Sequence, residues 1–135
     1  MQEEHLISDS ELVEMAMQAA ENAYAPYSDF KVGAAVLVED GGIYVGCNIE
    51  NASFGATVCA ERTAIFNAVS DGYKRIVKLA VASPLSRNYT MPCGICRQVA
   101  LEFGGKDLPV LCADMSGLYK EYTLEQLLPE AFMKF

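Results

Sequence analysis

The sequence predicts one α/β domain, a three-layer α/β/α sandwich with a mixed sheet of about five strands. Three observations lead to this prediction. The 135 residues are the usual length of one domain. No repeat, linker or low-complexity segment divides them, so residues 1–135 are expected to form a single domain. Segments with helical and strand-like periodicity follow one another in the order α-β-β-α-β-α-β-β-α, which places helices on the faces of a sheet.

The first helix is predicted over residues 8–23. Ser8 and Glu11 have the spacing of a capping box, in which each residue's side chain bonds the backbone of the other. Apolar residues then recur at helical spacing up to the region of Pro26, which stops the helix. These apolar residues are Leu12, Met15, Ala16, Ala19, Ala20 and Ala23.

Two strands are predicted over residues 31–38 and 43–49, which are rich in apolar and β-branched residues. The dipeptide Asp40-Gly41 between them is typical of a tight hairpin. A second helix is expected over residues 58–71, ended by Gly72.

The second half of the chain begins with a continuous apolar run over residues 75–83, which indicates a buried central strand. Pro92 is predicted to open a third helix that ends at Gly104 and Gly105. Proline at the first position and glycine just past the end are typical of helices.

Two further strands are predicted over residues 109–113 and 118–122. A short last helix should follow them. Thr123 and Gln126 have capping-box spacing at its start, and Pro129 stops it.

Composition excludes several classes of function. The chain is 52% hydrophobic and carries a net charge of −8, so it is a folded protein that repels phosphate backbones. The densest basic patch, Lys74, Arg75 and Lys78, is small, and a nucleic-acid partner is therefore not expected. The start of the chain lacks the pattern of a signal peptide and no segment is long enough to span a membrane, which predicts a cytoplasmic protein without a membrane partner. The high apolar content of so short a chain favours an oligomer.

Metal chemistry is the strongest functional signal. The chain has five cysteines, an odd number, which argues against a disulfide framework in a chain without a secretion signal. Cys59 and the pair Cys93 and Cys96 both fall at predicted helix starts, where partial positive charge stabilises thiolates. Three such ligands leave the fourth tetrahedral position of a Zn²⁺ ion open for water. Glu61, two residues after a ligand, is then placed to carry protons.

An all-thiolate site has a net charge of −1, and a more negative metal activates water less. A nearby cation should offset this charge. Arg62 and Arg97 each follow a site residue directly, and we expect Arg62 to supply the charge because Arg97 can point the other way.

Other ligand sets remain open at this point. Cys47 or Cys112 would close the zinc site as a fourth ligand, although a cysteine within a strand more often acts as a small buried apolar residue. His5, the only histidine, lies in an apparently frayed tail and is discounted as a ligand. A closed site would indicate a zinc-stabilised binding module without catalysis.

Five sequence blocks extend, in order, over almost the whole chain: residues 25–35 (APYSDFKVGAA), 46–52 (GCNIENA), 59–64 (CAERTA), 92–98 (PCGICRQ) and 127–132 (LLPEAF). Together they resemble the corresponding blocks of the small homotetrameric cytidine deaminases. The resemblance implies a cytidine deaminase-like fold and a homotetramer with active sites at its interfaces. It also implies hydrolysis of the nucleosides cytidine and 2′-deoxycytidine to uridine and 2′-deoxyuridine with release of ammonia, in pyrimidine salvage.

The resemblance also implies roles for residues outside the metal site. Asn48 and Glu50 would hold the ribose hydroxyls, which suits an amide and a carboxylate on one strand face. Phe30 would pack near the base, and Ala60 would also contact the substrate. Phe132 would reach the active site of a neighbouring subunit.

The same resemblance makes Cys59, Cys93 and Cys96 the ligands of one Zn²⁺ per subunit and Glu61 the proton carrier. One departure from the family's pattern is Phe54, where the family usually has Tyr. The missing phenol hydroxyl removes any hydrogen bond from that position to the sugar of a neighbouring subunit's ligand, whereas packing at that position can remain.

Two other deaminase classes share the cysteine motifs. One acts on modified cytosine nucleosides of the blasticidin type, and the segment 48–51 (NIEN) favours a plain nucleoside instead. The other edits RNA or DNA, which the negative charge of this chain disfavours.

Overall fold

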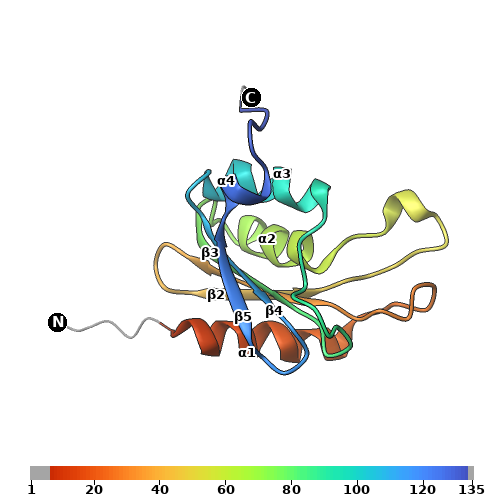
Figure 1. Ribbon diagram of the computed structural model, residues 1–135. Helices are drawn as coiled ribbons and strands as arrows, with labels where there is room; N and C mark the ends of the chain where they lie inside the picture. The colour runs from red at the N-terminus through yellow and green to blue at the C-terminus, as the bar shows by residue number, and fades with distance from the viewer. Residues whose placement is uncertain (1–6, 134–135) are drawn as a thin grey trace.

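The computed structural model describes residues 7–133, which form a five-stranded mixed sheet between layers of helices (Figure 1). Strand order is β2-β1-β3-β4-β5; β3 and β4 are parallel and the other neighbours antiparallel. The α-helices are α1 (Asp9–Ala19), α2 (Ala60–Ser70), α3 (Gly94–Gly104) and α4 (Leu124–Leu127), with 3₁₀ turns at Ala20–Asn22 and Phe54–Ala56. The strands are β1 (Gly33–Val38), β2 (Ile43–Cys47), β3 (Ile76–Ala82), β4 (Pro109–Ala113) and β5 (Tyr119–Thr123). The predicted fold class and element order are confirmed.

Two apolar cores lie on opposite faces of the sheet because neighbouring strand residues point to opposite sides. The core beneath α2, α3 and α4 contains Val36 and Leu79, whereas the core beneath α1 contains Ala35 and Ala80. Small residues let α1 lie close to the sheet. At Gly33, a Cβ atom would lie 1.9 Å from the carbonyl oxygen of Ala16 in α1.

A second close approach seats α2 on β2. A Cβ atom at Gly46 of β2 would lie 2.4 Å from the backbone nitrogen of Ala64 in α2. Glycine at this position therefore decides how near the helix comes to the sheet. Since α2 begins with the segment that follows Cys59, Gly46 also helps to place the metal site.

Local signals predicted most helix ends. Ser8 Oγ accepts a hydrogen bond from the Glu11 backbone at 3.1 Å, and the backbone of Ser8 donates to the Glu11 carboxylate at 2.9 Å. Thr123 and Gln126 make the corresponding pair of bonds at α4. Gly105, at a φ of 83°, ends α3.

The structure corrects the predicted role of Pro92. The helix α3 begins at Gly94, and its N-cap is Cys93 in an extended conformation. Pro92 therefore precedes the cap and is not the first helical residue. Because the N-cap backbone lies outside the helix, the side chain of Cys93 leaves the helix end toward the other sulfurs.

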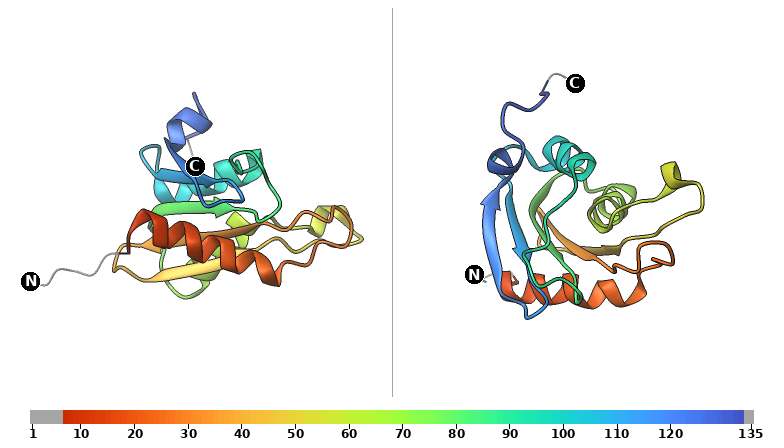
Figure 2. Two further views of the ribbon diagram at one scale, coloured as in Figure 1. Left: turned by 60° about the horizontal axis from the view of Figure 1, so that its bottom comes forward. Right: turned by 45° about the vertical axis from the view of Figure 1, so that its right-hand side comes forward.

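The second predicted strand also ends earlier than expected, at Cys47. Beyond it, Ile49 makes single bridges with Tyr24 on one side and Val58 on the other. The loop over residues 24–31 and the loop that carries Phe54–Ala56 project together beyond the sheet (Figure 2, right). Within residues 7–133 no helix has the length and apolar character needed to cross a membrane. His5 lies outside the described residues.

Candidate metal centre and substrate pocket

Three sulfur atoms meet where two helices begin. Cys59 is the N-cap of α2, Cys93 is the N-cap of α3, and Cys96 lies in the first turn of α3. The Sγ atoms of Cys59 and Cys93 are 3.3 Å apart, those of Cys93 and Cys96 are 3.4 Å apart, and all three lie within 4.8 Å of one another. Tetrahedral zinc with 2.3 Å bonds to sulfur places its sulfur ligands about 3.8 Å apart. The cluster fits this ion after shifts of a few tenths of an ångström.

The electrostatics of the cluster favour a cation. Hydrogen bonds from the Cys96 thiol and from Arg62 are the main causes that lower the pKa of Cys59 to about 5. The pKa of Cys96 is raised, first because it donates to Cys59 and second because it is buried. The Cys59 sulfur is thus charged at neutral pH, and a divalent cation bound beside it would favour loss of the proton of Cys96.

The two arginines point in different directions. Arg62 Nη2 lies 3.6 Å from Cys59 Sγ, against the sulfur cluster. Arg97 instead donates from Nε to the carbonyl of Pro92 and from Nη1 to the carbonyl of Leu127, both at 2.7 Å. The structure therefore brings Arg62, and not Arg97, to the sulfurs.

Cys47 and Cys112 are not members of the three-sulfur group within the described residues. Cys47 lies on β2, where it pairs in register with Gly33. Cys112 is buried in β4. The geometry favours an open site with three sulfur ligands over a closed site with four.

Glu61 lies in the first turn of α2 and is only 3% exposed. Burial raises the pKa of its carboxyl group to about 7, while backbone hydrogen bonds from Glu61 itself and from Cys93 act in the opposite direction. A carboxyl group with a pKa near neutrality both accepts and releases protons readily. Its position beside the sulfur cluster suits a proton carrier.

A cavity of about 280 Å³ borders this cluster. Its walls include Cys59, Cys93 and Glu61 as well as Ser28 and Glu50. Among the residues predicted to bind a substrate, the cavity brings together Phe30, Asn48, Glu50 and Ala60.

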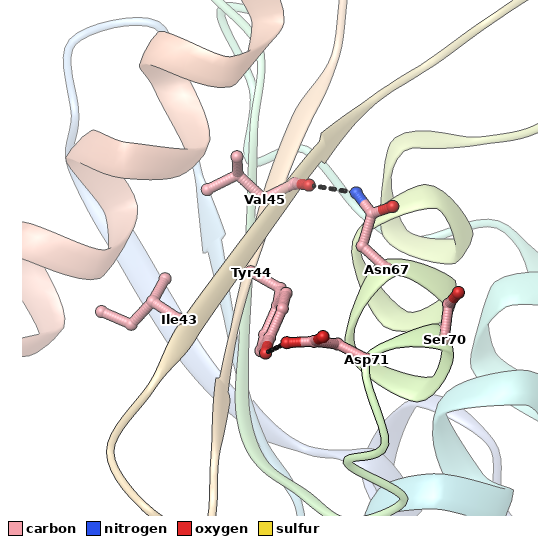
Figure 3. A pocket seen from close by; sticks show the side chains of 6 residues that line it. All are labelled: Ile43, Tyr44, Val45, Asn67, Ser70 and Asp71. Atoms are coloured by element: carbon pink, nitrogen blue, oxygen red, sulfur yellow. Dashed lines mark hydrogen bonds between the residues drawn. The ribbon is translucent and has the colours of Figure 1, made fainter.

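A larger and more open hollow lies between β2 and α2 (Figure 3). Its polar side chains bond groups within the hollow. The Tyr44 hydroxyl donates to Asp71, and Asn67 donates to the carbonyl of Val45 at 2.9 Å. None of its lining residues belongs to the three-sulfur group, whereas Cys59, Cys93 and Glu61 line the smaller cavity, which is therefore the candidate active site.

Hydrogen bonds fix the carboxylate of Glu50 in the cavity wall. Glu50 Oε1 accepts from the backbone nitrogens of Tyr27 and Ser28, at 2.9 and 3.1 Å, and Oε2 accepts from the Ser28 hydroxyl. These bonds, with that from the Ser28 hydroxyl as the largest cause, lower the pKa of Glu50. A charged acceptor therefore faces the cavity at neutral pH.

Asn48 contacts the loop over residues 24–31 and Val32, the residue directly before β1. Its Nδ2 donates to the carbonyl of Phe30 at 2.8 Å, and its Oδ1 accepts from the backbone of Val32 at 2.9 Å. By donor and acceptor count, Asn48 retains one amide N–H and Glu50 retains acceptor capacity on Oε2. These are complementary partners for a sugar hydroxyl.

Two predicted contacts with a neighbouring subunit lie away from the cavity in the single chain. Phe132 is 67% exposed, and its carbonyl accepts a hydrogen bond from Gln98 at 3.2 Å. Phe54 is 76% exposed and packs edge-on against Tyr27, with ring centroids 6.0 Å apart.

Sequence reasoning missed several cavity residues, among them Ser28, Thr90 and Met91. Ser28 lies within a block that resembles the deaminases, and its spacing before Phe30 was the available signal. Thr90 is buried, and its hydroxyl has no hydrogen-bond partner within residues 7–133. Nothing in the sequence around Thr90 indicated this position.

The fold and the site together define a zinc-binding α/β domain with a buried carboxyl group beside the metal ligands, the arrangement found in zinc deaminases. Residues 6–112 match the family described as cytidine and deoxycytidylate deaminase zinc-binding region, and the chain belongs to this family. The group of Cys59, Cys93 and Cys96 is placed to hold the zinc ion that the family description names.

Similar proteins agree with this assignment. The cytidine deaminase of Sporosarcina psychrophila is 50% identical over 123 residues, which cover 91% of this chain and 90% of that protein. The crystal structure of cytidine deaminase from Burkholderia pseudomallei has a TM-score of 0.89 at 44% identity and covers 93% of this chain and 100% of that one. The cytidine deaminase structure from Mycobacterium tuberculosis has a TM-score of 0.83 at 42% identity, with 95% and 99% covered.

Proposed function

We propose that the protein is a cytidine deaminase, which hydrolyses cytidine and 2′-deoxycytidine to uridine and 2′-deoxyuridine and releases ammonia. The observation that carries this proposal is the cavity itself. Its lining combines a buried carboxyl group and two of the clustered cysteines with a charged acceptor and an amide. A nucleoside has the matching polarity, with a hydrolysable amino group on its base and hydroxyls on its sugar.

One Zn²⁺ per subunit, held by Cys59, Cys93 and Cys96, supplies Lewis acidity and lowers the pKa of water when bound. Glu61 accepts a proton from the attacking water as a C–O bond forms at C4 of the base. It delivers this proton to ring N3, then takes the remaining proton from the new C4 hydroxyl and passes it to the amino group as the C–N bond breaks and the C4 carbonyl forms. Arg62 offsets part of the negative charge of the sulfurs.

The other cavity residues bind and orient the nucleoside. Asn48 donates to, and Glu50 accepts from, the ribose hydroxyls through the capacity that their internal hydrogen bonds leave free. Phe30 packs against the base. Ala60, at the start of α2, offers a backbone N–H that is not used within the helix.

The assembly and cellular setting belong to the same proposal. A homotetramer would bring Phe132 of one subunit to the active site of another, and the exposed apolar side chains of Phe132 and Phe54 support this arrangement. The proposal includes a place in pyrimidine salvage, which the substrate class supports, and a cytoplasmic location. Light scattering of the purified protein at neutral pH tests the tetramer.

Turnover of a substrate panel tests the function. Purified protein with zinc quantified per chain is given cytidine, 2′-deoxycytidine, a blasticidin-type nucleoside and a single-stranded oligonucleotide. Deamination is followed by ultraviolet absorbance. We expect turnover of the first two at one zinc per chain. Protein that contains one zinc per chain and leaves both nucleosides unchanged would contradict the proposal.

A further inference from the structure

The hydroxyl of Ser28 lies at the junction of two groups that face the substrate cavity. It donates a hydrogen bond to Glu50 Oε2 and accepts one from the backbone nitrogen of Phe30 at 3.1 Å. The backbone nitrogen of Ser28 also donates to Glu50 Oε1 at 3.1 Å. The Ser28 side chain thus joins Glu50, the proposed ribose-binding carboxylate, to Phe30, the residue proposed to pack against the base.

The Phe30 backbone is held from both sides by this network. Ser28 accepts from its N–H, and Asn48 donates to its carbonyl at 2.8 Å. Asp29, between Ser28 and Phe30, has a φ of 58°, a conformation that a non-glycine residue keeps only where its surroundings impose it. The hydrogen bonds of Ser28 and Asn48 are therefore part of what holds this turn.

The same loop has little apolar packing to hold it. Tyr27 is 53% exposed and Phe30 is 39% exposed, and Ser28 is also exposed. Two backbone hydrogen bonds of Tyr24 anchor the start of the loop. Its N–H donates to the Asn48 carbonyl at 3.0 Å, and its carbonyl accepts from the Glu50 nitrogen at 2.8 Å. Beyond that anchor, the positions of Glu50 and Phe30 relative to each other depend on polar contacts, and those of Ser28 are central.

We infer that Ser28 is a positioning residue for nucleoside binding, whose hydroxyl directs Glu50 Oε2 toward the ribose hydroxyls and holds the turn that presents Phe30. The inference rests on the proposed function and adds to it a residue with no direct part in the chemistry. Without this donor Glu50 keeps only the two backbone hydrogen bonds to Oε1, so Oε2 is no longer directed toward the ribose hydroxyls and its bond to the sugar weakens.

Two substrates separate this role from a general effect on the loop. Cytidine carries both ribose hydroxyls, and 2′,3′-dideoxycytidine lacks them. Loss of Phe30 placement lowers kcat/KM for both substrates, whereas loss of Glu50 placement acts only where the hydroxyls are present. We expect Ser28→Ala to reduce the cytidine to dideoxycytidine ratio of kcat/KM about tenfold or more, the usual effect of one hydrogen bond to a charged group.

Three further variants complete the design. Ser28→Thr keeps the hydroxyl and should restore the ratio. Ser28→Cys fills the same space with a weak donor and should lower the cytidine to dideoxycytidine ratio. It replaces the alanine variant in the test if that variant does not fold. Ser116→Ala is the matched control, since the Ser116 hydroxyl donates to the Asp114 carboxylate at 2.6 Å in an exposed loop outside the cavity.

Thermal unfolding and zinc content of each variant accompany the kinetics. A parent-like ratio in the folded Ala or Cys variants would overturn the inference, as would an equal loss of kcat/KM on both substrates. A parent protein that does not deaminate cytidine would instead contradict the proposed function.

Discussion

The guanidinium of Arg97 donates a 2.7 Å hydrogen bond to the carbonyl oxygen of Leu127, thirty residues further along the chain. Leu127 is the last residue of α4, and the same guanidinium also bonds the carbonyl of Pro92, directly before the Cys93 cap. Arg97 therefore connects the C-terminal segment to the beginning of the metal-binding helix.

Removal of this connection should weaken both parts of the structure. In Arg97→Ala, two carbonyl groups lose a charged donor, and we expect a loss of about 1.5–3 kcal/mol in the free energy of unfolding. Zinc should also pass to a chelator faster, because the Cys93 backbone is less restrained. Urea denaturation and chelator kinetics measure the two effects. Arg87→Ala, in an exposed loop, is the control. If both variants had the same unfolding free energy and the same rate of zinc loss, Arg97 would not stabilise the contact between the C-terminal segment and α3.

The exchange of Glu61 for glutamine should remove proton transfer while it preserves shape. We expect kcat to fall by about 10²–10⁴-fold, with zinc content and thermal stability close to those of the parent. Cytidine turnover with zinc quantified per chain is the measurement. Glu102→Gln, on the exposed side of α3, should behave like the parent. Near-parent turnover by the Glu61 variant would show that another group carries the proton.

Ionisation of the Tyr44 hydroxyl should destabilise the folded protein at alkaline pH. Its hydrogen bond to Asp71 is the main cause that raises its pKa to about 12, from 10.0 in the unfolded chain. The folded protein thus holds this proton more tightly, so the contribution is complete below about pH 10 and disappears as pH rises toward about 12. The difference in Tm between the parent and Tyr44→Phe should shrink over this interval. A difference that is constant from pH 8 to 11.5 would contradict the assignment.

Gly46→Ala should push α2 away from β2. The added methyl would lie 2.4 Å from the Ala64 nitrogen, a backbone atom that moves only with the helix. We expect destabilisation of about 1–3 kcal/mol or more and reduced activity, since α2 carries Glu61. Denaturant unfolding of this variant is compared with that of Gly55→Ala, where a methyl meets nothing within 4 Å. Equal stability of the two variants would mean that the helix accommodates the methyl without cost.

Local sequence patterns determined the elements whose causes are themselves local. The capping pairs Ser8 with Glu11 and Thr123 with Gln126 act within one helical turn, so their spacing in the sequence was sufficient. Cys93 and Cys96 also lie within one helical turn, so their spacing in the sequence was sufficient to predict that they face the same way. Pro92 shows the limit of such signals, because a proline suits both the first helical position and the position before the cap, and only the extended backbone of Cys93 decided between them.

The sequence by itself determined the residue types available to the site: three cysteines in two motifs, a glutamate two residues after one of them, and an amide and a carboxylate two residues apart. Only the tertiary structure decided which groups meet. The Cys59 to Cys93 contact arises because α2 and α3 begin at the same end of the sheet, and the choice of Arg62 over Arg97 follows from where each side chain finds acceptors. The contact between Ser28 and Glu50 likewise joins residues on two different loops. Such contacts depend on packing between distant segments, and local spacing carries no information about that packing.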